Sequence, residues 1–125
     1  MSNRNEFTTL QRAWLDDLRT TTAPQAHAQL QDREGGNCCL GRACIVAGLV
    51  ALQSEQGPAF SFFGEENDGE PTQEWGKQTY LFTDDGMGRC WRMNDADRLD
   101  FRQIADRIEA SPWLYFSNFD VPGAA

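Results

Sequence analysis

Four cysteines and one histidine are the residues of this chain best suited to metal or covalent chemistry: Cys38, Cys39, Cys44, Cys90 and His27. Thiolates and an imidazole could hold zinc together. Cys38 and Cys39 are adjacent, however, and adjacent side chains tend to point apart. A chain with this much apolar material also has no need of disulfides for stability. The pattern therefore favours buried thiols that pack as small hydrophobic side chains.

A nucleophilic cysteine is the alternative use of these residues. Cys38 or Cys39 would lie in the first turn of a helix, where the helix dipole favours the thiolate, and His27 would serve as the general base. No third member of a catalytic set is recognisable, and His27 lies in a stretch rich in Gln and Ala. The sequence thus predicts a protein that is not an enzyme, with a thiol enzyme as the second alternative.

Carboxylates could bind a cation at Asp95, Asp97 and Asp100, but the calcium-loop pattern is not met there or at 65–70. Asp100 suits a helix N-cap, and Asn94 with Asp95 suits an Asx-type turn. The phosphate-binding pattern Gly-x4-Gly-Lys-Ser/Thr and the dinucleotide pattern Gly-x-Gly-x2-Gly are both missing. We expect no metal and no cofactor.

The negative charge is concentrated in the middle of the chain. The 125 residues carry 19 acidic and 11 basic side chains, a net charge of −8. Residues 53–85 contain eight of the acidic side chains and one lysine, a net charge of −7. Such asymmetry can mark an interaction surface, although acidic loops rich in Gly and Pro are also ordinary solvated surface. An acidic protein repels nucleic-acid phosphate and anionic lipid, so the expected partner is a protein with a basic surface.

An aromatic segment near the C-terminus is the second candidate for binding. Residues 113–119 read Trp-Leu-Tyr-Phe-Ser-Asn-Phe. Aromatic side chains dominate binding hot spots, but an apolar chain end can equally close the core. Ten of the eleven basic residues are arginines, which pair with carboxylates through two hydrogen bonds.

The chain reads as one domain, 1–125, of the α+β class, with three main helices packed on a small antiparallel sheet. We expect helices over about 4–19 and 38–54, capped by Asn3 and Asn37, and a short helical piece over 25–31. A third helix begins after Asp100, whose spacing to Gln103 matches a capping box. Phe101, Ile104, Ala105 and Ile108 form its buried stripe, and Ser111-Pro112 ends it.

Strands are expected over 59–63 and in a hairpin formed by 77–83 and 87–93 around Asp84-Asp85-Gly86. The longest apolar run, Cys44–Leu52, has nine residues, whereas a membrane span needs about 20. The N-terminus lacks the apolar stretch of a secretory signal. We therefore expect a protein of the cytoplasm.

Three motifs of the chain stand out: Trp14-x3-Leu18, the stretch Cys38-Cys39-Leu40-Gly41, and Asn94-Asp95 followed by Phe101-x2-Ile104-Ala105-x2-Ile108-Glu109. Together they resemble a family of small proteins encoded by tailed phages and prophages. These pieces cover about half of the chain, and 53–91 lies outside the resemblance. The resemblance implies a phage or prophage origin, and small acidic phage proteins often inhibit host proteins or defence systems.

The sequence therefore predicts an accessory protein that binds and inhibits a host macromolecule, with counter-defence such as CRISPR inhibition included. The predicted partner-binding residues are Glu65, Glu66, Asp68, Glu70, Glu74, Asp84, Asp85, Trp113 and Phe116. The first alternative is a protein that sequesters a small molecule or nucleotide through Arg42, Arg89 and Arg92.

Overall fold

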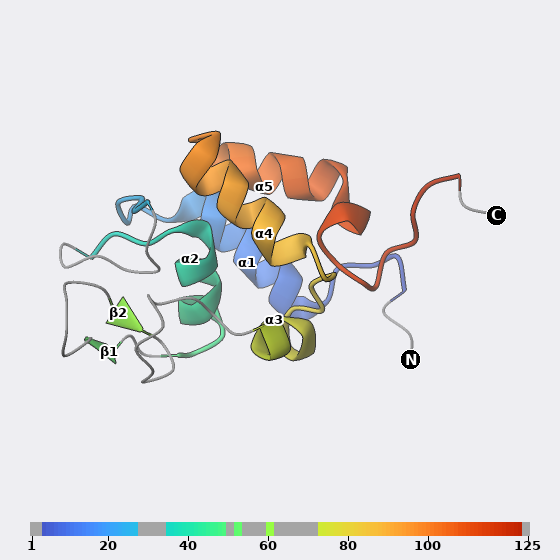
Figure 1. The fold of residues 1–125 in the computed structure, drawn as a ribbon, viewed down its shortest axis with the longest axis horizontal. Coiled ribbons are helices and arrows are strands. Elements are labelled where there is room, and N and C mark those ends of the chain that lie inside the picture. Colours follow the sequence, from blue (N-terminus) through green and yellow to red (C-terminus); the bar gives the residue numbers. More distant parts are fainter. Residues whose placement is uncertain (1–3, 28–34, 50–51, 54–59, 62–72, 124–125) are drawn as a thin grey trace.

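Helices make up most of the described backbone (Figure 1). The computed structural model describes residues 4–27, 35–49, 52–53, 60–61 and 73–123. Its α-helices are α1 (Thr9–Thr20), α2 (Cys39–Val46), α3 (Gln73–Thr79), α4 (Gly86–Trp91) and α5 (Phe101–Ala110). A π-helix, Arg92–Ala96, continues α4, and a 3-10 turn, Pro112–Leu114, follows α5. The strands β1 (Leu52–Gln53) and β2 (Phe60–Ser61) pair in antiparallel register.

The predicted α+β class is wrong, because the helices pack on one another rather than on a sheet. Helix α1 lies against α5 and α2, and α2 also contacts α4. The two-residue ladder of β1 and β2 lies to one side of this bundle (Figure 1). The predicted hairpin does not form, since 86–91 is α4. Phe82 makes its bridge with Phe116 instead.

An aromatic cluster around Trp14 forms the centre of the core. The Trp14 ring is fully buried and lies 5.5 Å from Tyr80, 5.6 Å from Phe82 and 6.2 Å from Phe116, measured between ring centroids. The indole N–H donates to the carbonyl of Cys39 at 3.0 Å. Four segments distant in sequence are therefore joined by one side chain, as a large aromatic residue with one polar atom allows.

Helix boundaries follow local capping chemistry where a good cap is present. Asp100 accepts from the Gln103 amide at 2.8 Å, and the Gln103 side chain accepts from the Asp100 amide at 2.9 Å. The predicted capping box is confirmed. The buried stripe Phe101, Ile104, Ala105 and Ile108 and the end at Ser111 are confirmed as well.

Three other predicted boundaries are wrong. Helix α1 is capped by Thr8, since Asn5 has a left-handed φ of 62° and cannot continue a helix from residue 4. Helix α2 ends at Val46, two residues before Gly48, whose φ is +87°. Its cap is Cys38, whose sulfur accepts from the Gly41 amide, whereas Asn37 pairs with Gln25 in a bridge.

The expected helical piece over 25–31 is not seen at Gln25–His27, and its remaining residues lie outside the described ones. Phe60–Ser61 confirms the strand expected within 59–63 at two of its residues. None of the described helices is long and apolar enough to cross a membrane.

Candidate binding surface

The acidic residues predicted to bind a partner fall into two groups. Glu65, Glu66, Asp68 and Glu70 lie outside the described residues. Glu74 in α3 and the pair Asp84 and Asp85 just before α4 are exposed. The second group therefore has the accessibility that a partner contact requires.

The turn that carries Asp84 and Asp85 is fixed to the C-terminal segment by its backbone. The Thr83 amide donates to the carbonyl of Tyr115 at 2.9 Å, and the Thr83 hydroxyl donates to the carbonyl of Leu114 at 3.3 Å. The Ser117 amide donates to the carbonyl of Leu81 at 2.6 Å. Two stretches more than 30 residues apart in sequence are thereby held side by side.

The aromatic segment divides between core and surface. Phe116 is fully buried and stacks on Phe82 with ring centroids 5.6 Å apart, so its side chain closes the core rather than facing a partner. Trp113 is half-buried, and Leu114 is 37% exposed. We call Asp84, Asp85, Trp113 and Leu114 the turn surface, because they flank the hydrogen bonds that join Thr83 to Leu114 and Tyr115.

Charges at the edge of this surface are paired weakly. The Lys77 ammonium lies 2.8 Å from an Asp84 oxygen, and this contact lowers the pKa of Asp84 and raises that of Lys77. The Asp84 side chain is nevertheless 86% exposed, and such exposed pairs contribute little to stability. The Glu74 carboxylate accepts from the side-chain nitrogen of Gln78 at 2.7 Å. Asp85 makes no ion pair with any described residue.

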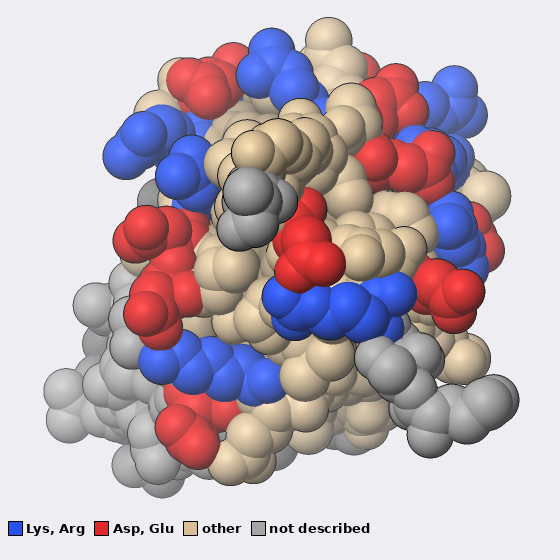
Figure 2. Space-filling view, turned by 90° about the vertical axis from the view of Figure 1, so that its right-hand side faces the viewer, with Lys and Arg blue, Asp and Glu red and all other residues tan. Residues whose placement is uncertain are grey.

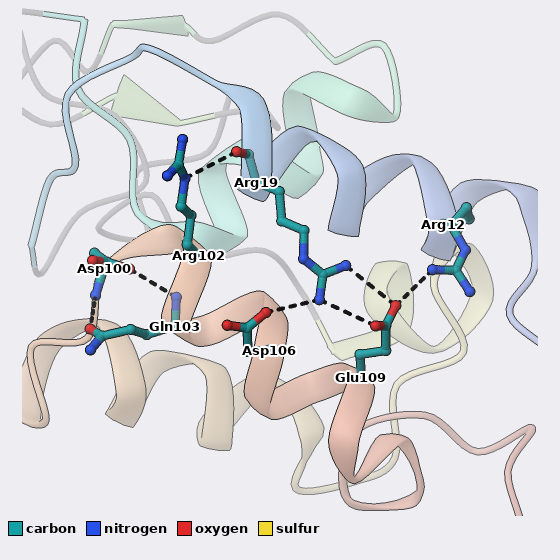
Figure 3. Close-up of polar contacts among 7 residues, drawn as sticks. All are labelled: Arg12, Arg19, Asp100, Arg102, Gln103, Asp106 and Glu109. Atoms are coloured by element: carbon teal, nitrogen blue, oxygen red, sulfur yellow. Dashed lines mark hydrogen bonds and ion pairs between the residues drawn. The ribbon is translucent and has the colours of Figure 1, made fainter.

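Away from this surface, arginines and carboxylates neutralise one another between α1 and α5 (Figure 3). Glu109 accepts from Arg12 at 2.7 Å and from Arg19 at 3.3 Å, which lowers the pKa of Glu109. Arg19 also reaches Asp106 at 3.1 Å. The Arg102 side chain donates to the backbone carbonyl of Arg19 at 3.3 Å. In Figure 2 acidic and basic side chains alternate over the face at the right of Figure 1.

The three arginines proposed to bind an anionic ligand differ in their exposure and in their ion pairs. Arg42 binds Asp17 through two hydrogen bonds, at 2.8 Å and 2.6 Å, and its side chain is 14% exposed. This two-fold pairing joins α2 to α1 and occupies the guanidinium. Arg89 and Arg92 are exposed and form no ion pair within the described part of the chain. The structure therefore does not offer Arg42 for ligand binding.

The thiols lie in the core, as the sequence predicts. Cys38, Cys39, Cys44 and Cys90 are all fully buried and free. Burial raises the pKa of Cys38 and of Cys44 far above the usual range. A hydrogen bond with the Cys90 thiol, together with burial, raises the pKa of Cys39 as well. A nucleophile requires the opposite shift, toward the thiolate.

We expect all four thiols of the folded protein to react slowly with iodoacetamide. Neither access nor ionisation favours attack, so the rate constants should lie at least about a hundredfold below that of free cysteine at neutral pH. Mass spectrometry of timed samples gives these rates, and unfolding in guanidinium should make all four sites react. A single site that reacts at the rate of free cysteine in the folded protein would contradict the core interpretation.

Buried polar side chains are the feature that the sequence patterns did not reveal: Gln11, Asn37, Asn94 and Asn118. The Asn94 oxygen accepts from the Gln25 side chain at 2.8 Å and from the Cys39 amide at 3.2 Å. Its nitrogen donates to the Ala26 carbonyl at 2.9 Å and to Asp95 at 2.7 Å. Asn94 thus ties the π-helix to two other segments rather than forming only a local turn.

No group of three or more His, Cys, Asp or Glu side chains among the described residues could hold a metal ion. Asp100 is used as a helix cap. The strongest geometric candidate for function is therefore the turn surface together with Glu74.

No protein-family model, curated protein or solved structure matches this chain.

Proposed function

We propose that this protein is a non-enzymatic accessory protein that binds a host protein through its acidic segment and thereby blocks it. The segment comprises the acidic residues of 53–85, and its target is a basic surface. Carboxylates placed where a nucleic-acid-binding protein holds phosphate would compete with the nucleic acid. Counter-defence, such as inhibition of a CRISPR complex, is one activity of this kind.

The observation that carries the proposal is the uneven distribution of negative charge along the chain. Residues 53–85 have a net charge of −7, which is almost all of the chain's −8. In the helical bundle, carboxylates are matched by arginines: Glu109 and Asp106 by Arg12 and Arg19, and Asp17 by Arg42. The excess negative charge therefore belongs to one segment, from which Glu74, Asp84 and Asp85 are exposed.

The test is to neutralise the centre of the segment with Glu65→Gln, Glu66→Gln, Asp68→Asn and Glu70→Gln. Wild-type protein is used to capture a basic partner from host lysate, and its association rate with each variant is measured at low and high salt. Long-range charge acts mainly on association, so we expect the rate to fall at least about tenfold, with most of its salt dependence lost. The melting temperature should hardly change.

A matched control removes four exposed carboxylates from outside the segment: Glu6→Gln, Asp16→Asn, Asp97→Asn and Asp106→Asn. It has the same net charge as the test variant. If position matters, the control should keep most of the association rate. Equal losses of association rate in both variants would indicate a general charge effect. An association rate that changes neither in the variants nor with salt would contradict the proposal.

A further inference from the structure

The turn surface combines charge and apolar area in a fixed arrangement. Thr83 hydrogen-bonds the backbone at Leu114 and Tyr115, so the backbone that leads into Asp84 and Asp85 runs beside Leu114. Leu114 is among the few large hydrophobic side chains exposed in the described part of the chain. The same two segments are also joined by the bridge between the buried residues Phe82 and Phe116.

The charges around this surface define what it can receive. Asp85 lacks an ion-pair partner among the described side chains, and Asp84 is held only by the exposed Lys77. A cationic group of a partner can therefore bind the Asp85 carboxylate directly and compete with Lys77 for the Asp84 carboxylate. Arg89 lies one helical turn beyond Asp85 and limits the acidic region on that side. The site thus fits one or two cations next to an apolar group, rather than a long basic tract.

We propose that the turn surface docks a protein segment in which a basic side chain stands next to a large apolar one. This inference rests on the proposed function and adds a contact of a different kind to it. The carboxylates bind the cation, while Leu114 and the half-buried Trp113 cover the apolar side chain. Apolar contact is insensitive to salt and acts mainly on dissociation, so it would give the complex a component that charge alone cannot supply.

The test uses two synthetic peptides of equal charge and length, one alternating arginine with leucine and one alternating arginine with glycine. Each is titrated into the isotopically labelled full chain, and backbone amide shifts are followed by NMR. We expect the Arg/Leu peptide to shift Thr83–Gly86 and Trp113–Tyr115 together and to bind at least threefold more tightly than the Arg/Gly peptide.

Two variants isolate the apolar contribution. Leu114→Ser should remove the advantage of the Arg/Leu peptide and leave the affinity for the Arg/Gly peptide unchanged. Val121→Ser, at a side chain that is 57% exposed outside the turn surface, should change neither. Both side chains are exposed enough that circular dichroism should report an intact fold.

The outcomes separate this inference from the proposed function. Equal affinity for both peptides, or shifts confined to acidic residues, would overturn the docking inference and leave the proposed function standing. Binding of neither peptide anywhere on the chain would count against both. If the same amides shift on raising the protein concentration without peptide, the occupant is a second copy of this chain and the inference is wrong.

Discussion

Replacing Asn94 with alanine is expected to lower the free energy of unfolding by about 2–5 kcal/mol. The substitution removes the acceptor of the buried Cys39 amide and the donor to the Ala26 carbonyl. Each buried group left without a partner costs about 1–3 kcal/mol. The Gln25 side chain keeps its second hydrogen bond, to the carbonyl of Leu99, so losing its bond to Asn94 costs less free energy. Because small domains are stable by only about 5–15 kcal/mol, the effect should be large.

Urea unfolding followed by tryptophan fluorescence gives this value. Asp97→Ala is the matched control, since Asp97 is exposed and ends the same π-helix with its backbone. It should change stability by less than about 0.5 kcal/mol. A loss for Asn94→Ala no larger than that of the control would show that the four hydrogen bonds contribute little.

Gly86→Ala should destabilise the protein by about 3 kcal/mol, against the ordinary preference of helices for alanine. A Cβ at position 86 would overlap the carbonyl oxygen of Tyr115 and lie 3.1 Å from the Thr83 hydroxyl oxygen. Both are atoms of the contact that fixes the turn surface. Relief requires the backbone at 83–86 to move away from 114–115. We therefore also expect the Arg/Leu peptide to bind the variant less tightly.

Gly88, two positions along the same helix, supplies the control. A Cβ there meets nothing within 4 Å, and the residue is exposed. Gly88→Ala should therefore raise stability by about 0.5–1 kcal/mol through reduced freedom of the unfolded chain. Thermal unfolding of the two variants should shift in opposite directions. A shift in the same direction for both would show that the close approach at Gly86 is not limiting.

Local chemistry explains which predictions from sequence are confirmed. The capping box at Asp100 and the stripe Phe101, Ile104, Ala105 and Ile108 depend on residues three or four apart within one helix. Such interactions need no knowledge of the rest of the chain. The burial of the cysteines is predictable for a similar reason, since apolar surroundings in sequence and a weakly polar thiol favour the core.

The hairpin around Asp84-Asp85-Gly86 fails because its signal is local while the deciding contact is not. Asp-Gly between aromatic runs is typical of a tight turn. Here Gly86 begins α4, and its missing side chain makes room for the Tyr115 carbonyl, 29 residues further along. Phe82 pairs with Phe116 and not with a residue of 87–93. Because these long-range contacts replace the predicted hairpin, the described fold is helical and not α+β.

The sequence by itself determined the amphipathic helices α1 and α5, the buried thiols and the position of the negative charge, because each depends on residue type or short spacing. Only the tertiary structure decided that Phe116 closes the core, that Arg42 is bound to Asp17, and that the turn at Thr83 is hydrogen-bonded to Leu114. These are contacts between segments that no local periodicity relates. They form because burial of the aromatic side chains sets the path of each backbone segment through the fold. The position of each exposed side chain then depends on the path of its segment.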